Sequence, residues 1–135
     1  MSTAPPTSAK IAIGLGFILG TWTFVDGAHR LITGDFVRIH GKLGPWADLV
    51  RWLGANPMQF GPVLMALGVA WLVASNVYLF RNSPASWRGM LLMVVFSSWY
   101  AGVASVGLVL QLLLLLWPTT RAALEAAAET TTARP

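Results

Sequence analysis

Long apolar segments separated by short polar ones run along this chain, and the first apolar segment begins at Lys10. A helix continued from there to Ile32 has about 23 residues, or roughly 34 Å at 1.5 Å per residue. That length crosses the ~30 Å hydrocarbon core of a bilayer. Gly34 then suits a C-terminal cap. We predict a first span over residues 10–33, preceded by a disordered tail over residues 1–9.

A second span is predicted over residues 61–80, which carry no charged side chain. This segment has the length of a membrane-crossing helix. Pro62 fits the first turn of the helix, and Arg81 marks the polar boundary at its end. Asn76 is its one strongly polar residue and lies near that end.

The mostly apolar stretch from Trp87 to Trp117 fits two interpretations. One helix of this length measures roughly 46 Å, which overshoots a ~30 Å core. The sequence SSWYAGVAS in its middle is typical of a turn at the membrane surface. We therefore predict a hairpin of two short spans over residues 84–99 and 102–117. The alternative is one long, tilted last helix and three spans. Gln111 is expected to bond to another span, with Asn76 as the candidate partner.

The first loop, residues 35–60, is the only long polar part and contains GPWADLVRWLGANP. Pro45 fits a first helical position, Gly54 fits a helix stop, and Pro57 prevents a restart. The apolar face of this helix carries Trp46, Leu49, Val50 and Leu53. We predict a short interfacial helix over residues 45–53, because indole rings prefer the headgroup level. A small cap packed over the ends of the spans is a compatible interpretation.

These elements together predict an all-α fold, a membrane-embedded four-helix bundle with a short interfacial helix in the first loop. One transmembrane domain covers residues 10–118, and residues 119–135 form a short Ala-rich helix and a disordered tail. The composition agrees, because 56% of the 135 residues are hydrophobic and 10% are charged. Soluble domains carry about 25% charged residues. We therefore expect a multi-pass membrane protein.

Charge and cysteine content exclude several function classes. The nine Lys and Arg residues behind the net charge of +4 are scattered, so they form no basic stripe that binds nucleic acid. The chain has no Cys, which excludes disulfides and Cys-ligated metals.

The positive-inside rule gives the orientation of the predicted spans. With four spans, the side of both termini carries Lys10, Arg81, Arg88, Arg121 and Arg134. The other side carries Arg30, Arg38, Lys42 and Arg51. This excess favours both termini in the cytoplasm. With three spans, the same rule places the first loop there instead.

The end of the first span carries a polar cluster of Asp26, His29, Arg30 and Thr33. Their spacing of i, i+3, i+4 and i+7 places them on one helix face. The favoured interpretation is an Asp26–Arg30 ion pair at the membrane boundary that ends the span. The alternative is a site that relays protons or binds a polar headgroup or substrate, because acids inside membranes are functional candidates.

No catalytic residue, metal or cofactor is expected. His29 and His40 are the only histidines, and neither lies in the middle of a span as a pair of haem ligands would. No second carboxylate stands at a metal-ligand spacing. Ser97, Ser98 and Tyr100 have no histidine or acid nearby in the sequence to activate a nucleophile.

Small residues and tryptophans predict helix contacts and membrane anchors. Gly16 and Gly20 form a G-x-x-x-G pattern that permits close helix approach, and Gly102 and Gly107 offer the same to the last span. The predicted interfacial anchors are Trp46, Trp52, Trp87, Trp99 and Trp117.

In the order of its sequence motifs, the chain resembles small bacterial four-span integral membrane proteins of unassigned function. The resemblance covers residues 11–117. It rests on DGAHRLITGDF, LGPWADLVRWLGANP, WRGMLLMVVF and the break at SSWYAG. It implies a four-helix membrane bundle with a capped loop, in the bacterial inner membrane. It implies no activity and no residue roles.

Three functions fit this sequence. The favoured one is a non-enzymatic accessory, assembly or structural subunit of a membrane complex, with the bilayer and other subunits or copies of itself as partners. The second is an oligomeric small-molecule or ion transporter, which needs polar groups at mid-bilayer depth such as Gln111 and Asp26. The third is a membrane enzyme acting on a lipid or quinone, which requires that Asp26, His29 and Arg30 point into one cleft.

Overall fold

The computed structural model of this chain describes residues 5–38, 43–100 and 104–132. Over these residues the chain is all-helical, with six α-helices, one short 3-10 helix and no strand. The helices α1 (Thr7–Thr33) and α3 (Gly61–Arg81) are each long and apolar enough to cross a membrane. A third crossing results if α5 (Ala104–Leu115) and α6 (Pro118–Thr132) count as one span, bent by 48°.

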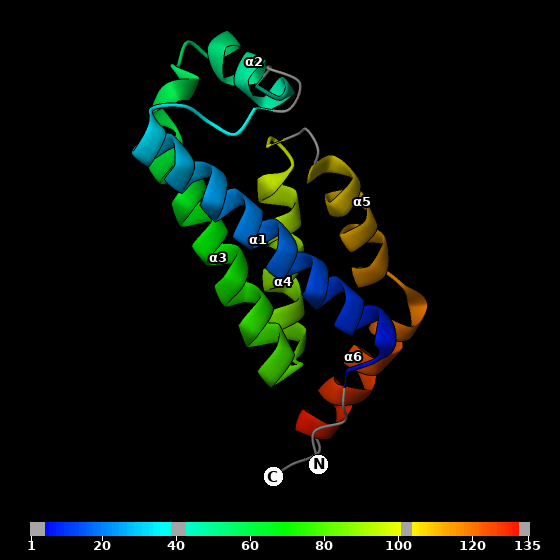
Figure 1. The fold of residues 1–135 in the computed structure, drawn as a ribbon. Coiled ribbons are helices and arrows are strands. Elements are labelled where there is room, and N and C mark those ends of the chain that lie inside the picture. The colour runs from blue at the N-terminus through cyan, green and yellow to red at the C-terminus, as the bar shows by residue number, and fades with distance from the viewer. Residues whose placement is uncertain (1–4, 39–42, 101–103, 133–135) are drawn as a thin grey trace.

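The helices pack around one apolar core (Figure 1). α1 and α3 lie antiparallel and in contact along their length, α5 packs on α1, and α4 (Pro84–Ser97) packs on α3 and α5. α2 (Pro45–Trp52) lies across the end where α1 finishes. α6 lies at the opposite end, beside the first turns of α1.

The contact between α1 and α3 is made by backbone atoms, because glycines face each other there. A methyl group on Gly27 would lie 2.6 Å from the carbonyl oxygen of Gly61. A methyl group on Gly68 would lie 2.5 Å from the backbone nitrogen of Phe24 and 2.7 Å from the carbonyl oxygen of Gly20. Helices without side chains at the contact approach closely and gain van der Waals packing, which drives helix association in membranes.

The glycines predicted for helix packing lie at helix contacts wherever the structure describes them. Gly20 faces Trp71 of α3, and Gly107 faces Leu19 of α1. Gly16 faces Ser75. Gly102 lies outside the described residues.

The long apolar stretch is broken where the sequence predicts a turn. α4 ends at Ser97, residues 98–100 form a turn, and α5 begins at Ala104. The alternative of one unbroken helix over residues 87–117 is therefore wrong. α4 and α5 measure about 21 and 18 Å at 1.5 Å per residue, less than a ~30 Å core. For this reason neither helix alone has the length of a membrane span, and the described residues contain two helices of that length, or three spans if the bent pair of α5 and α6 counts as one.

The helix in the first loop begins at Pro45 as predicted and ends at Trp52, one residue early. Its predicted apolar face is divided in the structure. Trp46 and Val50 are buried against the core, whereas Leu49 and Leu53 are exposed. Outside this helix, α1 begins earlier than predicted, and α6 extends further, to Thr132.

Candidate functional site

Asp26 lies in the protein interior near the end of α1 and is bound from two directions. Its Oδ1 accepts a hydrogen bond of 2.7 Å from the backbone N–H of Val37. Its Oδ2 accepts a hydrogen bond from the hydroxyl of Tyr100. Asp26 is only 3% exposed. Val37 follows α1 and Tyr100 follows α4, so one carboxylate joins three segments of the chain.

The other three residues of the polar cluster lie further along α1 and contact the first loop. Arg30 donates from Nε to the carbonyl oxygen of Met58 at 2.8 Å. His29 Nδ1 lies 2.8 Å from the carbonyl oxygen of Asp35. The hydroxyl of Thr33 donates to the carbonyl oxygen of His29 at 2.8 Å. These contacts attach the loop to the last turns of α1.

The expected ion pair between Asp26 and Arg30 is not formed. Asp26 points inward to Tyr100, whereas Arg30 reaches the 3-10 helix η1 (Pro57–Gln59). His29 binds the carbonyl oxygen of Asp35, in the same loop as Val37. The side chains of Asp26, His29 and Arg30 are thus each bound to other parts of the chain.

Aromatic rings enclose Tyr100 on the loop side. The ring centroid of Trp46 lies 5.6 Å from that of Tyr100 and 5.2 Å from that of Phe36. Trp99 lies 6.0 Å from Tyr100 and 5.9 Å from Phe60. Tilted and edge-on ring pairs at such distances contribute roughly 0.5–1.5 kcal/mol beyond their burial. These rings hold α2 over the end of the helices.

Burial raises the pKa of the Tyr100 hydroxyl well above its ordinary value, and Asp26 raises it further. The cause is that a second negative charge beside the carboxylate, away from water, is unfavourable. The Trp22 indole opposes this shift.

Asp35 is an acid of a different kind, because it lies near the surface. Its carboxylate and the Arg38 guanidinium form an ion pair at 2.7 Å. This hydrogen-bonded pair lowers the pKa of Asp35, and the backbone N–H of Phe36 lowers it further. The charge of Asp35 is thus neutralised within its own loop.

A second set of polar groups lies between the helices, away from both ends of α1. Gln111 of α5 is fully buried and donates from Nε2 to the carbonyl oxygen of Ala12 in α1 at 2.9 Å. Ser75 of α3 is also fully buried and donates to Met90 Sδ at 3.8 Å. Gly16 makes room for both, since a methyl group there would lie 2.3 Å from Ser75 Oγ.

The expected contact between Gln111 and Asn76 is wrong. Asn76 is exposed and donates to the carbonyl oxygen of Leu72 on its own helix. Oε1 of Gln111 and the hydroxyl of Tyr78 are buried without a hydrogen-bond partner among the described residues. Buried polar groups are nearly always paired, so these two atoms need an explanation.

The five tryptophans predicted as interfacial anchors lie in different surroundings. Trp46 is buried, and Trp87 and Trp99 are half-buried. Trp52 and Trp117 are 81% and 55% exposed. Only the last two present most of their indole rings to the surroundings, as an anchor at the headgroup level does.

A shallow groove of about 410 Å³ lies on the outer face of α1. It is lined by Phe17, Ile18, Thr21, Trp22 and Val25. No set of three His, Asp or Glu side chains that could hold a metal ion occurs in the part of the chain that the structure describes. His40 lies outside that part.

Tyr100 and Val37 complete the site around Asp26, and the sequence analysis did not identify them. One signal was present for Tyr100. In a hairpin of short helices, the turn after α4 and the end of α1 lie at the same end of the molecule, so Tyr100 and Asp26 can meet. Comparison of the chain with known protein families, with curated proteins and with solved structures finds no match.

Proposed function

We propose that this chain is a non-enzymatic accessory subunit of a larger membrane complex, in which α1 contacts a partner. The observation that carries the proposal is that the polar cluster binds the chain's own atoms. Asp26 binds Tyr100 and Val37, and Arg30 binds Met58. These bonds hold two loops on the end of α1 and give the subunit a fixed shape.

The outer groove of α1 is the surface that we assign to the partner. Trp22 forms part of its lining. The other lining residues are apolar apart from Thr21. Membrane helices associate by van der Waals packing and interhelical hydrogen bonds, for which this groove offers apolar side chains and one hydroxyl. The occupant we propose is an apolar transmembrane helix of another subunit.

Site-specific photocrosslinking in the source membrane tests this proposal. A photoreactive phenylalanine replaces Thr21 in the groove, and the matched control replaces Val73, which is 56% exposed on α3. We expect one protein adduct of defined mass from position 21 and none from position 73. A chain that gives no protein adduct at position 21, and that purifies alone in mild detergent, contradicts the proposal.

An oligomeric transporter of small molecules or ions is the second candidate. The observation that favours it is a pair of interior polar atoms, Gln111 Oε1 and Tyr78 Oη, for which the described residues supply no hydrogen-bond partner. Polar groups inside a membrane protein commonly mark a substrate or ion path.

Flux into vesicles separates the two candidates. The purified chain is reconstituted into liposomes that contain a pH-sensitive dye, beside empty liposomes and liposomes with Gln111→Leu. Transport of protons or of a proton-coupled solute predicts a flux that the substitution abolishes. A flux equal to that of empty liposomes contradicts transport of protons or of a proton-coupled solute by this chain.

We also propose four crossings in a bacterial inner membrane, with both termini in the cytoplasm. The break between α4 and α5 supports it, since it returns the chain to the end where α4 began. The chain has no native Cys, so single cysteines can be labelled cleanly in intact cells. We expect cysteines at Asp48 and Ser98 to react from outside, and those at Ala85 and Glu125 to react only after lysis. Positions 98 and 125 labelling from the same side would exclude four crossings.

A further inference from the structure

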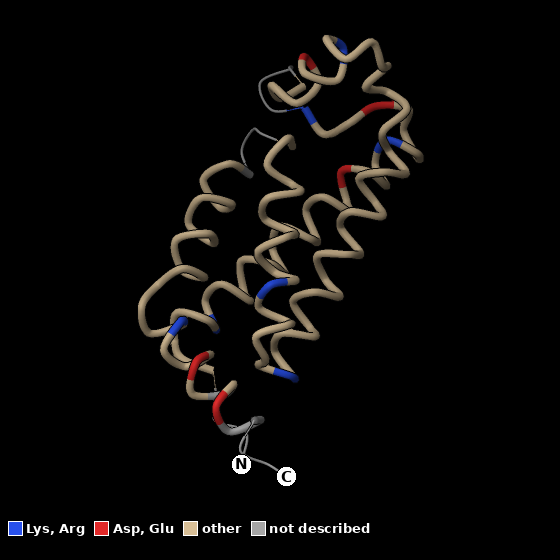
Figure 2. The backbone as a smooth tube through the Cα atoms, turned by 180° about the vertical axis from the view of Figure 1, so that it is seen from behind, with Lys and Arg blue, Asp and Glu red and all other residues tan. Residues whose placement is uncertain are grey.

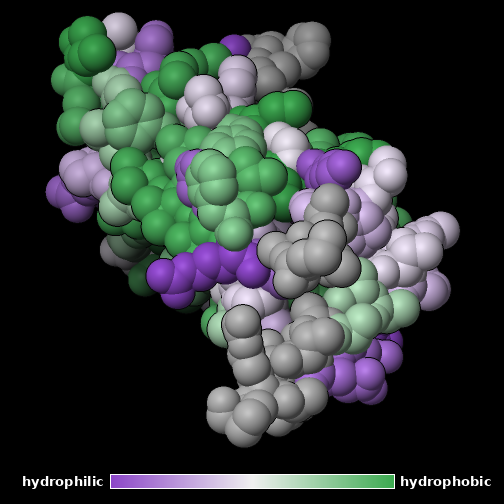
Figure 3. Space-filling view, turned by 90° about the horizontal axis from the view of Figure 1, so that it is seen from below, coloured by the Kyte–Doolittle hydropathy of each residue, from purple (hydrophilic) through white to green (hydrophobic). Residues whose placement is uncertain are grey.

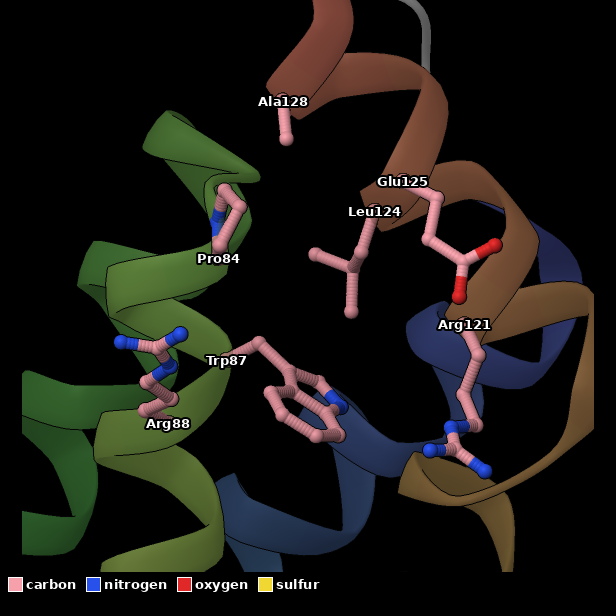
Figure 4. A pocket seen from close by; sticks show the side chains of 7 residues that line it. All are labelled: Pro84, Trp87, Arg88, Arg121, Leu124, Glu125 and Ala128. Carbon is pink, nitrogen blue, oxygen red and sulfur yellow. The ribbon is translucent and has the colours of Figure 1, made fainter.

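A pocket of about 210 Å³ lies between α4 and α6, at the end of the molecule opposite the polar cluster (Figure 4). Trp87 and Arg88 line it from α4. Arg121, Leu124 and Glu125 line it from α6. Pockets for drug-sized ligands measure about 300–1,000 Å³. This one suits a smaller group, or the polar part of a molecule that extends beyond it.

The wall of this pocket is fixed by a hydrogen bond. Trp87 donates from its indole N–H to the carbonyl oxygen of Leu115 at 2.9 Å, which joins α4 to the end of α5. Figure 4 shows the indole between the two arginines, with Arg88 on one side and Arg121 on the other. The pocket therefore has an ordered aromatic floor, and the two arginines lie at its opposite edges with their guanidinium groups directed outward (Figure 4).

The two arginines of the pocket have no acidic partner in the part of the chain that the structure describes. Neither Arg88 nor Arg121 forms an ion pair or a side-chain hydrogen bond with another residue in the described ranges. At the other end of the molecule, Arg38 and Arg51 form ion pairs at 2.7 and 2.8 Å with acids three residues away. Figure 2 shows basic residues at both ends of the tube. The cations at the pocket are thus available to an anion from outside the chain.

The pocket lies where a membrane-crossing helix ends. α3 finishes at Arg81, and α4 begins at Pro84. From Arg88, α4 continues with Leu92 and Phe96 at intervals of four residues, on one face of the helix. Both are 68% exposed. Seen from this end, hydrophilic side chains lie directly beside hydrophobic surface (Figure 3).

We propose that this pocket binds the headgroup of an amine-bearing glycerophospholipid. The exposed side chains of Arg88 and Arg121 turn in from opposite sides of the indole to bind its phosphodiester, because guanidinium groups match phosphate oxygens in charge and geometry. Glu125 binds the ammonium group of the same headgroup. The acyl chains lie along Leu92 and Phe96 on the exposed face of α4.

The carboxylate in the pocket selects this lipid class over an anionic one. Two guanidinium groups and one carboxylate match a headgroup with one phosphate and one ammonium. A phosphatidylglycerol headgroup presents the phosphate without a cation, so Glu125 would lie beside a negative charge. Replacing that carboxylate by an amide removes this repulsion and the attraction for ammonium together.

Native mass spectrometry of the full chain tests the proposal. The protein is released from vesicles that hold equal amounts of phosphatidylethanolamine and phosphatidylglycerol. We expect retained lipid to be mainly the ethanolamine form. The double substitution Arg88→Gln with Arg121→Gln should lower its retention at least about tenfold, since two charge-assisted contacts are lost. Glu125→Gln should keep the lipid bound and remove the preference.

Arg81→Gln is the matched control, because Arg81 lies at the same end and does not line the pocket. It should leave retention unchanged. The melting temperature should stay the same in all variants, because Arg88 and Arg121 are exposed. Equal retention by the wild type and the double variant would overturn the site. Displacement of the lipid by millimolar inorganic phosphate would also overturn it in favour of a free phosphate ligand. A preference for phosphatidylglycerol in the wild type would overturn the role of Glu125.

Discussion

The hydroxyl of Tyr100 donates a hydrogen bond to Oδ2 of Asp26, although the two residues are 74 positions apart in the sequence. This bond joins the turn after α4 to the end of α1. The other carboxylate oxygen accepts from Val37 and so joins the first loop as well. Asp26 and Tyr100 are both buried, so neither group finds water when its partner is removed.

Tyr100→Phe should lower the free energy of unfolding by about 1–3 kcal/mol. The substitution removes the donor and leaves a buried carboxylate oxygen without its partner. The measurement is denaturant unfolding in detergent micelles, followed by circular dichroism. Tyr78→Phe is the matched control, because that hydroxyl is buried and has no partner among the described residues. Tyr78→Phe should change the free energy of unfolding by less than about 0.5 kcal/mol. Equal effects of the two substitutions would contradict the role given to Asp26.

Tyr100 should remain protonated at pH values where an ordinary tyrosine ionises, near 10. Its pKa is raised by burial and by Asp26. The folded state therefore prefers the protonated form. The contribution of Tyr100 to stability is fully present below pH ~10 and is lost as the pH rises through the raised pKa.

Absorbance of ionised tyrosine measures this directly in a Tyr78→Phe background, where Tyr100 is the only tyrosine left. We expect no ionisation near pH 10 in the folded protein and ordinary ionisation after denaturation. A midpoint near 10 without denaturant would show that Tyr100 is accessible to water and not bound to Asp26.

Gly68→Ala should separate α1 from α3. The new methyl group would lie 2.5 Å from the backbone nitrogen of Phe24, which no rotamer change can relieve. Inserted groups in a tight contact cost about 1–3 kcal/mol. Gly89→Ala on α4 is the control, because its methyl group meets nothing within 4 Å. Alanine favours helix, so this variant should be stabilised by up to ~1 kcal/mol. In a thermal unfolding measurement, Gly68→Ala should therefore lower the melting temperature and Gly89→Ala should raise it.

Arg38→Gln should raise the pKa of Asp35 toward the ordinary aspartate value of 3.8. The wild-type pKa is lowered mainly by the hydrogen bond from Arg38. The ion pair between Asp35 and Arg38 therefore stabilises the folded state above pH 3.8. This stabilisation is lost as the pH falls through the lowered pKa of Asp35. The check is a carboxyl-carbon NMR titration of both proteins. A wild-type midpoint at or above that of the variant would contradict the ion pair.

Several elements could be predicted because their signals are local. The helix over Pro45–Trp52 follows from Pro45 at its start and Gly54 just beyond its end, and the structure has it. The turn after Ser97 follows from polar and small residues in an apolar run. Residues 10–33 and 61–80 were identified as helices of membrane-crossing length by their apolar content, and α1 and α3 cover them.

The contacts inside the molecule were harder to predict, because they depend on where separate helices meet. Asp26 and Arg30 have the spacing of an ion pair, yet each finds a better-placed partner in another segment. Gln111 binds a backbone carbonyl oxygen, which no side-chain pattern marks. One signal was missed. Gly61, Gly68 and Ser75 recur every seven residues, and a repeat of small residues at that interval predicts a close helix contact.

The glycine contact between α1 and α3 also sets an order of assembly during synthesis. Chains emerge with the N-terminus first, so both helices are complete once Arg81 has been synthesised. Their contact needs no residue beyond that point, because Gly20, Gly27, Gly61 and Gly68 are already present. α4 and α5 then meet an existing pair. Asp26 can form its hydrogen bond only after Tyr100 has been synthesised, and the contacts of Gly107 and Gln111 with α1 become possible later still.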